Sequence, residues 1–288
     1  MKKHKDVILA VGALRDAPVR PLNQNVIGRF TNRPYKRTPD LLTFLISPLG
    51  DLILIPLRTL YAWRRMEWCR VWTYAHDMGA RTLPFVGIVM ACVGVIMVVQ
   101  SANQALRIIG DLSPLGPIFL ELLVREMGPA IVALMVCARC GASLAAEAGM
   151  LVAGDQLDAL RLCGSGATTY LFGPSLLGGL LVLPALVFFG TCIAYGVGGI
   201  AAHFMYDVGW GTYFDVSHMR IADPVICMVK ASIFGLVIPV MAIRAGINAR
   251  GGSAGVGHAA TVGVIGSSVM VLACDFFVGT LAYLWVRP

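Results

Sequence analysis

The 288-residue sequence predicts an all-α, polytopic membrane protein in which N-terminal interfacial helices are followed by five transmembrane helices. Hydrophobic residues make up 57% of the chain and charged residues only 14%, whereas a soluble domain usually has about 25% charged residues. Five apolar stretches each reach the roughly 20 residues needed to cross a bilayer. Basic residues gather before the first stretch, as they do on the cytoplasmic side of membrane proteins.

The N-terminal section is the most basic part of the chain. Residues 1–81 hold 14 of the 23 Lys and Arg residues and 6 of the 16 Asp and Glu residues, which gives this section a net charge of +8. Such a section is typical of the cytoplasmic face and can also rest on anionic lipid headgroups. No RNA- or DNA-binding motif accompanies the charge, so we expect no nucleic-acid partner.

Two regions are predicted before the first span. Residues 1–40 are polar and basic without a clear period, which indicates a flexible N-terminal extension and no cleavable signal peptide. Residues 41–80 combine interrupted apolar runs with Trp, Tyr and Arg, a mixture that favours the membrane interface. We interpret this region as interfacial (elbow) helices, and a partly inserted hairpin is the alternative.

Residues 81–288 are predicted to form one five-span domain. Its spans lie at about 83–102, 116–150, 170–202, 224–247 and 260–286. With a cytoplasmic N-terminus, the connections 151–169 and 248–259 also lie in the cytoplasm. The charges of the connections give modest support to this orientation. The outer connection 203–223 holds three Asp and one Arg, whereas the inner connection 248–259 holds one Arg and no acid.

The second span contains an unusual stretch, in which Arg125 and Glu126 are followed by Gly128 and Pro129. A charge at the bilayer centre costs at least about 3 kcal/mol, so it needs a partner or a water-filled cavity. Pro129 has no N–H, so the carbonyl of Arg125 loses its helical partner. The chemistry of these residues leaves two interpretations open: a structural ion pair, such as Glu121 with Arg125, or a functional polar site.

Two charges in other spans are predicted to lie at a similar depth. At about 1.5 Å per residue, Glu126, Lys230 and Asp275 lie about 15, 9 and 16 Å below the outer surface. They can therefore meet, together with Arg125, if the second, fourth and fifth spans pack against one another.

Other polar residues in the spans suggest simpler roles. Arg139 and Glu147 are eight residues apart, near one helix face, and we interpret them as an interfacial ion pair that orients helices. Cys137 and Cys140 form a C-x-x-C without a second pair, which favours small buried apolar residues over a metal or redox site. No metal-ligand spacing recurs around the His residues, so no metal site is expected.

A short amphipathic helix is predicted at about 153–163, between the second and third spans. Its core is "DQLDAL", which comprises Asp155, Gln156, Leu157, Asp158, Ala159 and Leu160. It suits either a docking element for a soluble motor or a capped interfacial helix. The chain has no G-x-x-x-x-G-K-[ST] motif, so ATP and Mg would have to bind in another chain.

Several motifs in order resemble the MlaE (YrbE-like) permease family, over about residues 65–286. They are "LVREMGPAIVALMVCARCGASLAAEAGML", "DQLDALRLCG", "MVKASIFGLVIP" and "GVGHAATVGVIGSSVMVLACDFF". The resemblance implies a homodimeric permease of the bacterial inner (cytoplasmic) membrane, in an ABC transporter that moves phospholipid or related lipids. It implies an ABC ATPase subunit below, a hexameric MCE-domain lipid-binding protein on the outer face and, in some systems, a STAS-domain protein.

The resemblance also implies roles for particular residues. The family's charged positions fall on Arg125, Glu126, Lys230 and Asp275, which would form a polar network that lines or gates an outward-facing lipid cavity. The family's coupling helix, usually E-Q-[IL]-D-A-L, falls on residues 155–160, with Asp155 in place of the usual Glu. No bond chemistry is implied for this chain.

Two other classes of function are less consistent with the sequence. A secondary transporter or ion channel could use the same buried charges as a relay, but the short inner helix and the missing inverted repeat argue against it. An intramembrane enzyme would need a catalytic constellation, and no Ser/His, Asp/Asp or metal-ligand set lies at a shared depth.

Overall fold

The computed structural model describes residues 52, 55, 56, 68–108, 110–162, 168–215 and 219–285, and every regular element in these ranges is helical. The predicted extension 1–40 and most of the predicted interfacial region lie outside the described residues. Within these described ranges, five helical stretches are long and apolar enough to cross a membrane. The predicted all-α, five-span fold class is therefore confirmed.

The first described helices form a bent pair. Helix α5 (Trp68–Gly79) buries Val71 and Met78 and leaves Trp72 78% exposed. Its amphipathic pattern, with Trp68 and Trp72 on the open side, suits a membrane interface. After a short corner, α6 (Leu83–Ile108) is apolar on nearly all sides, as expected for a span.

The second span is assembled from five consecutive helical pieces. These are α7 (Leu115–Leu122), η2 (Leu123–Met127), α8 (Gly128–Val136), η3 (Cys137–Gly141) and α9 (Ala142–Ala153). The two η pieces are single π-helical turns. A π turn inserts one extra residue into a helix, and such turns are frequent at functional sites.

In the loop before α7, the Ser113 N–H and hydroxyl donate to Asp111 and hold the pKa of its carboxyl below the ordinary value.

The predicted inner helix is α10 (Gln156–Leu162), and it follows α9 after a tight corner. Asp155 turns the chain there with a left-handed φ of 54°, which Asp tolerates better than most residues. Its carbonyl accepts the first bond of α10 from the Ala159 N–H, at 3.2 Å.

The third span follows the π-helical turn η4 (Thr168–Phe172) and is formed by α11 (Gly173–Tyr206). Its 34 residues span about 51 Å at 1.5 Å per residue, more than a bilayer core of about 30 Å, so it must tilt or protrude. The short helix α12 (Trp210–Tyr213) packs back against its end, where Tyr213 stacks on Tyr195.

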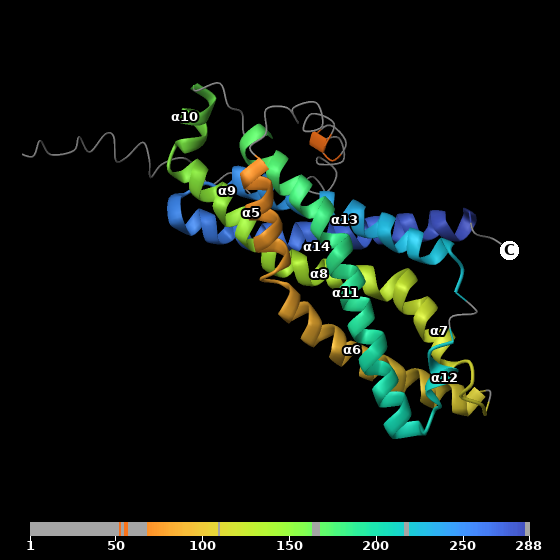
Figure 1. Cartoon of the computed structure of the whole chain (residues 1–288). Helices are drawn as coiled ribbons and strands as arrows, with labels where there is room; N and C mark the ends of the chain where they lie inside the picture. The colour runs from red at the N-terminus through yellow and green to blue at the C-terminus, as the bar shows by residue number, and fades with distance from the viewer. Residues whose placement is uncertain are drawn as a thin grey trace, which may run out of the picture. The chain divides into compact units, whose positions relative to one another are not determined.

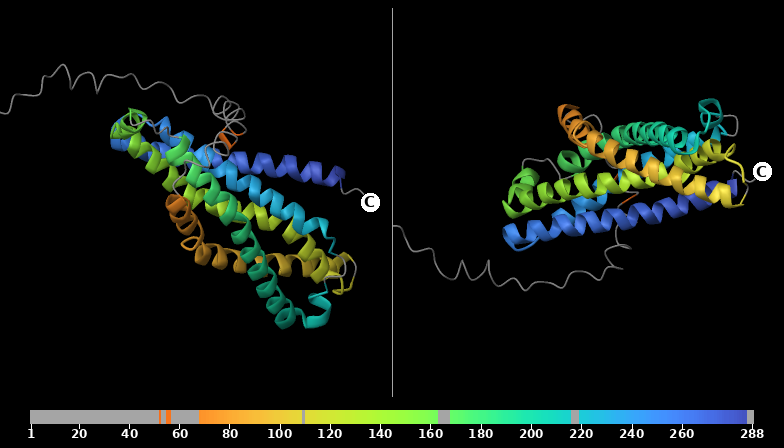
Figure 2. Two further views of the ribbon diagram at one scale, coloured as in Figure 1. Left: turned by 45° about the horizontal axis from the view of Figure 1, so that its top comes forward. Right: turned by 90° about the horizontal axis from the view of Figure 1, so that it is seen from below.

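The last two spans are α13 (Ala222–Ile247) and α14 (Gly252–Trp285), joined by a turn in which Gly251 and Gly252 have positive φ values of 94° and 69°. Helix α13 packs against α11, α14 and α9, and it is the most buried of the spans (Figure 1). The views in Figure 2 likewise show α13 within the group of long helices.

Small residues bring these helices close together. Gly179 of α11 faces Gly235 of α13, and a Cβ on either one would overlap the backbone of the other. Gly94 of α6 meets the Ala194 backbone in the same way. This is the close approach that small residues allow in lipid, where apolar burial gives little drive for association.

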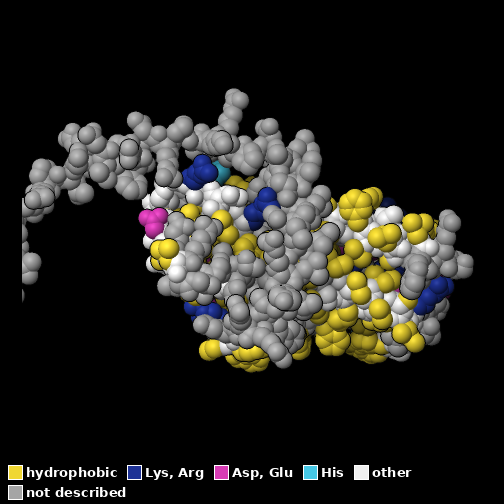
Figure 3. All heavy atoms as spheres, turned by 90° about the horizontal axis from the view of Figure 1, so that it is seen from above, with side chains coloured by type: hydrophobic (Ala, Val, Ile, Leu, Met, Phe, Trp, Pro, Cys, Tyr) yellow, Lys and Arg dark blue, Asp and Glu magenta, His cyan; other side chains and the backbone are white. Residues whose placement is uncertain are grey.

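Hydrophobic side chains also cover much of the outside. Large apolar residues are exposed on every long helix, as on α14, where Phe276 is 70% exposed. The face drawn in Figure 3 is mostly hydrophobic where side chains are described, with few charges visible. An apolar surface of this extent is unfavourable in water and suits a lipid environment.

Candidate functional site

The centre of the candidate site is Lys230, a fully buried lysine of α13. Its Nζ lies 2.7 Å from Glu126 Oε2 of η2 and 3.0 Å from Asp275 Oδ1 of α14. The predicted meeting of the second, fourth and fifth spans is therefore observed. A buried ammonium is costly without partners, and here two carboxylates surround it.

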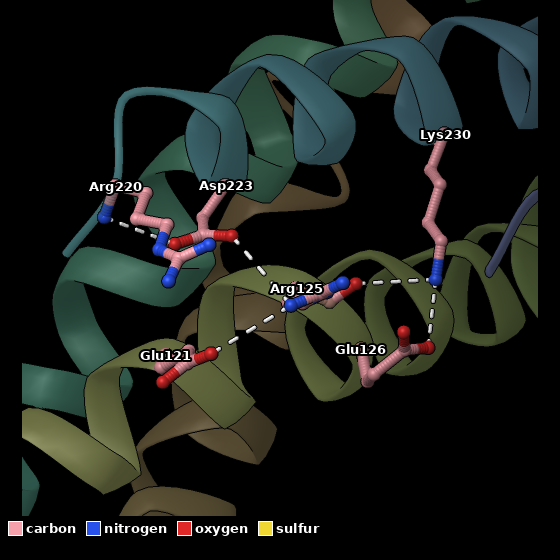
Figure 4. Close-up of polar contacts among 6 residues, drawn as sticks. All are labelled: Glu121, Arg125, Glu126, Arg220, Asp223 and Lys230. Atoms are coloured by element: carbon pink, nitrogen blue, oxygen red, sulfur yellow. Dashed lines mark hydrogen bonds and ion pairs between the residues drawn. The ribbon is translucent and has the colours of Figure 1, made fainter. Parts of the chain in front are cut away.

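The same ammonium gives a hydrogen-bond partner to the Arg125 carbonyl, which loses its helical partner because Pro129 has no N–H. Lys230 Nζ donates to the carbonyl of Arg125 at 3.1 Å (Figure 4). The π-helical turn before Pro129 leads directly into α8, where Pro129 lies in the first turn. The defect and the charge cluster are thus one structure, because the lysine supplies the donor that the proline lacks.

The side chain of Arg125 points away from this cluster, as Figure 4 shows. Its Nη1 lies 3.6 Å from Glu121 Oε1 and 3.9 Å from Asp223 Oδ1. The Glu121–Arg125 pair that one interpretation predicted is present, but Asp223 adds a second, buried carboxylate. Asp223 is itself held by the Arg220 backbone N–H, which donates to Oδ2 at 3.1 Å.

The site thus contains two linked charge groups. The inner group is Lys230 with Glu126 and Asp275, and the outer group is Arg125 with Glu121 and Asp223. They are joined by the backbone of residues 125 and 126. Glu126 and Glu121 have side chains 40% and 48% exposed, so each group has one carboxylate that other polar groups can reach.

Two further residues of the site were not predicted. Asp223 appeared in the sequence as an ordinary acid of the outer connection, yet its side chain is only 2% exposed. Gly279 of α14 lies so close that a Cβ would sit 3.4 Å from both Glu126 Oε1 and Lys230 Nζ. Asp275 and Gly279 are four residues apart on α14, and this helical spacing is the signal that could have found the glycine.

Arg139 and Glu147 do not pair with one another within the described ranges. Arg139 Nη1 donates to Thr82 Oγ1 at 2.5 Å, whereas Glu147 Oε1 accepts from the Tyr74 hydroxyl at 2.6 Å. The predicted ion pair between Arg139 and Glu147 is therefore wrong. Eight residues along a helix separate the two positions by about 12 Å, which is too far for a direct ion pair. Arg139 instead bonds to the corner before α6, and Glu147 bonds to α5.

The predicted coupling residues lie at one end of the bundle, where α10 begins at Gln156 directly after Asp155. Leu157 is buried, Leu160 is partly exposed and Leu162 is 90% exposed. The side chain of Asp158 lies outside the described part of the structure. The exposed side of α10 is therefore available to another protein, while Leu157 attaches the helix to its own chain.

The cysteines and acids suggest no metal centre in the part of the chain that is described. Cys137 and Cys140 are both buried and free, and no group of three or more metal-ligand side chains lies together in those ranges. Cys140 Sγ instead lies 3.7 Å from the Thr82 hydroxyl.

Comparison with known families shows which family the chain belongs to. A family model described as "Permease MlaE" matches residues 71–281, which include α10, both charge groups, four of the five spans from α6 to α13 and most of α14. The chain belongs to the MlaE permease family. The predicted resemblance is therefore confirmed.

Individual relatives of this MlaE permease support the same assignment. A probable ABC transporter permease protein of Rickettsia bellii is 29% identical over 208 residues, which cover 72% of this chain and 80% of that protein. One from Rickettsia typhi is 25% identical over 261 residues, 90% of this chain and 97% of that protein. The chloroplastic protein Trigalactosyldiacylglycerol 1 of Arabidopsis thaliana is 25% identical over 221 residues, 76% of this chain and 63% of that protein.

As an MlaE permease with five apolar spans, the chain is a multi-pass membrane protein and a permease subunit of an ABC transporter. Such a subunit implies a partner ATPase. The structure places α10 at one end of the bundle and the two charge groups within the spans.

Proposed function

We propose that this permease moves phospholipid or a related lipid between the bacterial inner membrane and an MCE-domain protein. Two copies of the chain would form the membrane unit, with the N-terminus and α10 in the cytoplasm. An ABC ATPase subunit would bind ATP and Mg and act on α10. A hexameric MCE-domain protein would receive or deliver lipid on the outer face, and a STAS-domain protein is a further candidate partner.

The observation that carries this proposal is the buried Lys230 between Glu126 and Asp275, inside spans that otherwise suit lipid. Ionisable residues within spans are rare and commonly mark substrate pathways. The cluster includes a half-exposed carboxylate, so it can contact a headgroup while α13 and α14 stay joined. In this role Arg125, Glu126, Lys230 and Asp275 line or gate the cavity.

Two further observations favour a lipid as the substrate. An open apolar groove of about 480 Å³ runs along α13 at the level of Lys230, lined by Pro224, Val225, Met228, Val229, Ser232, Ile233 and Leu236. Such a surface suits acyl chains, since nearly all of its atoms are apolar. The Arabidopsis relative also carries the name of a diacylglycerol lipid.

The first test is purification of the tagged chain from its native membrane in mild detergent. Mass spectrometry would identify the co-eluting proteins and the extracted lipids. We expect an ABC ATPase, an MCE-domain protein and bound phospholipid. Recovery of the chain without an ATPase and without lipid would contradict the proposal.

The second test compares variants in vesicles that contain the purified complex and fluorescent phosphatidylethanolamine. The double variant Glu126→Ala, Lys230→Ala should lose most ATP-dependent lipid movement when the rate is normalised to the folded protein recovered in the vesicles. Thr261→Val is a matched control, because its hydroxyl is exposed and, among the described residues, bonds to the carbonyl of Gly257 in its own helix. Normal transport by the double variant would remove the cluster from the transport pathway.

A further inference from the structure

A set of polar contacts at the α10 end is not used by the charge groups. Three residues at this end, Arg70 and Tyr74 on α5 and Thr82 in the corner after it, each bond to a distant part of the chain. The three bonds bridge 57 to 100 positions of sequence. Contacts of this kind fix the relative positions of elements that hydrophobic packing alone would leave free to slide in lipid.

Two of the bonds hold the chain on either side of α10. Before α10, the Tyr74 hydroxyl donates to Glu147 of α9 at 2.6 Å. After α10, Arg70 Nη2 donates to the Tyr170 hydroxyl of η4 at 2.6 Å, and its guanidinium carbon lies 3.7 Å from the centre of that ring. Helix α5, which has about three turns, therefore bonds both to the segment before α10 and to the segment after it.

The third bond continues this connection into the first span. Thr82, which is fully buried, accepts from Arg139 Nη1 and precedes α6 directly. Helix α5 is in turn seated on α11, where a Cβ on Gly178 would lie 3.2 Å from the Ala75 nitrogen. Figure 1 shows α5 toward the end of the bundle where α10 lies, with α6 leading away from it.

We propose that α5 acts as a strut. It holds the two segments that flank α10, with Tyr74 and Arg70 as positioning residues, and it transmits movement of these segments to α6. Since α5 bonds to α9 before α10 and to η4 after it, a shift of either of these segments must move α5 or break a bond. Helix α5 continues through a short corner into α6, so displacement at the base reaches the first span. The part that concerns transport rests on the proposed function, whereas the attachment of α10 does not.

The attachment is tested by hydrogen–deuterium exchange on the purified full chain in nanodiscs. Tyr74→Phe removes only the hydroxyl, and amides in residues 147–162 should then exchange several times faster. Thr73→Val is the matched control, because the neighbouring Thr73 hydroxyl bonds, within the described part of the chain, to the Cys69 carbonyl of its own helix. Equal exchange in the two variants would overturn the strut.

Variants at Glu147 separate the hydrogen bond from general loss of packing. Glu147→Gln keeps an acceptor oxygen and should exchange like the wild type, whereas Glu147→Ala should match Tyr74→Phe. The double variant Tyr74→Phe, Glu147→Ala should be no worse than either single variant, because both remove the same bond. Additive effects would show that the two residues act separately and would overturn the pairing.

The transmission step is tested with the ATPase bound. In vesicles with fluorescent phosphatidylethanolamine, Tyr74→Phe should lower the lipid moved per ATP hydrolysed severalfold, with the amount of bound ATPase unchanged. An unchanged ratio would overturn transmission through α5. If the wild-type complex moves no lipid at all, the proposed function fails, and the exchange measurements still decide whether α5 holds α10.

Discussion

Lys230 Nζ lies 2.7 Å from Glu126 Oε2, which joins the fourth span to the π-helical turn of the second. The lysine is fully buried, while the glutamate side chain is 40% exposed. The pair therefore connects the interior of the bundle to a carboxylate that a headgroup, water or another chain can reach.

Removing the charge of Lys230 should destabilise the protein strongly. Lys230→Met leaves Glu126 and Asp275 without their shared cation, and breaking a buried pair in this way typically costs about 3–5 kcal/mol. The thermal unfolding midpoint in detergent should fall clearly. The triple variant that adds Glu126→Gln and Asp275→Asn should recover much of the loss, because no unpaired charge remains. A triple variant as unstable as Lys230→Met would contradict this explanation.

Asp223 should contribute through both its charge and its bond to the backbone. Asp223→Asn can still accept from the Arg220 N–H, but it no longer attracts Arg125, whereas Asp223→Ala loses both contacts. We expect Ala to be less stable than Asn by about 1–3 kcal/mol, the usual cost of an unsatisfied buried group. Chemical or thermal unfolding measures this difference. Equal stability of the two variants would assign the role of Asp223 to charge alone.

The contact between α11 and α13 should not tolerate a side chain at Gly179. A Cβ there would overlap the Gly235 carbonyl, so Gly179→Ala must push the helices apart. Overpacking of this kind costs about 1–3 kcal/mol, which should lower the unfolding temperature. Gly196→Ala in the same helix is the control, since nothing lies within 4 Å of the added carbon. The control should be neutral or slightly stabilising, and similar melting of the two variants would be the contrary result.

The leucines of α10 should have different roles. Leu162→Asp and Leu160→Asp alter the open side of the helix, so they should weaken co-purification of the ATPase without changing the melting temperature. Leu157→Asp places a charge at a buried position and should instead lower the stability of the chain itself. Undiminished ATPase binding by Leu160→Asp, Leu162→Asp would show that α10 is not the docking element.

Much of the architecture could be predicted because it depends on local properties of the chain. Runs of apolar residues require lipid along their whole length, and five such runs became the five long helical stretches. The site was partly predictable for the same reason. Distance along a helix is proportional to residue number, so Glu126, Lys230 and Asp275 could be placed at similar depth before their contact was known.

The sequence by itself therefore determined the five spans, the short helix after the second and the charges that must find partners. Only the tertiary structure decided the partners: Arg125 turned toward Asp223, Glu147 toward Tyr74 and Arg139 toward Thr82. The partners depend on how each helix is rotated about its own axis, which sets the direction in which its side chains point. Two π-helical turns each shift the face of the second span by one residue, and glycine contacts set which sides of neighbouring helices meet.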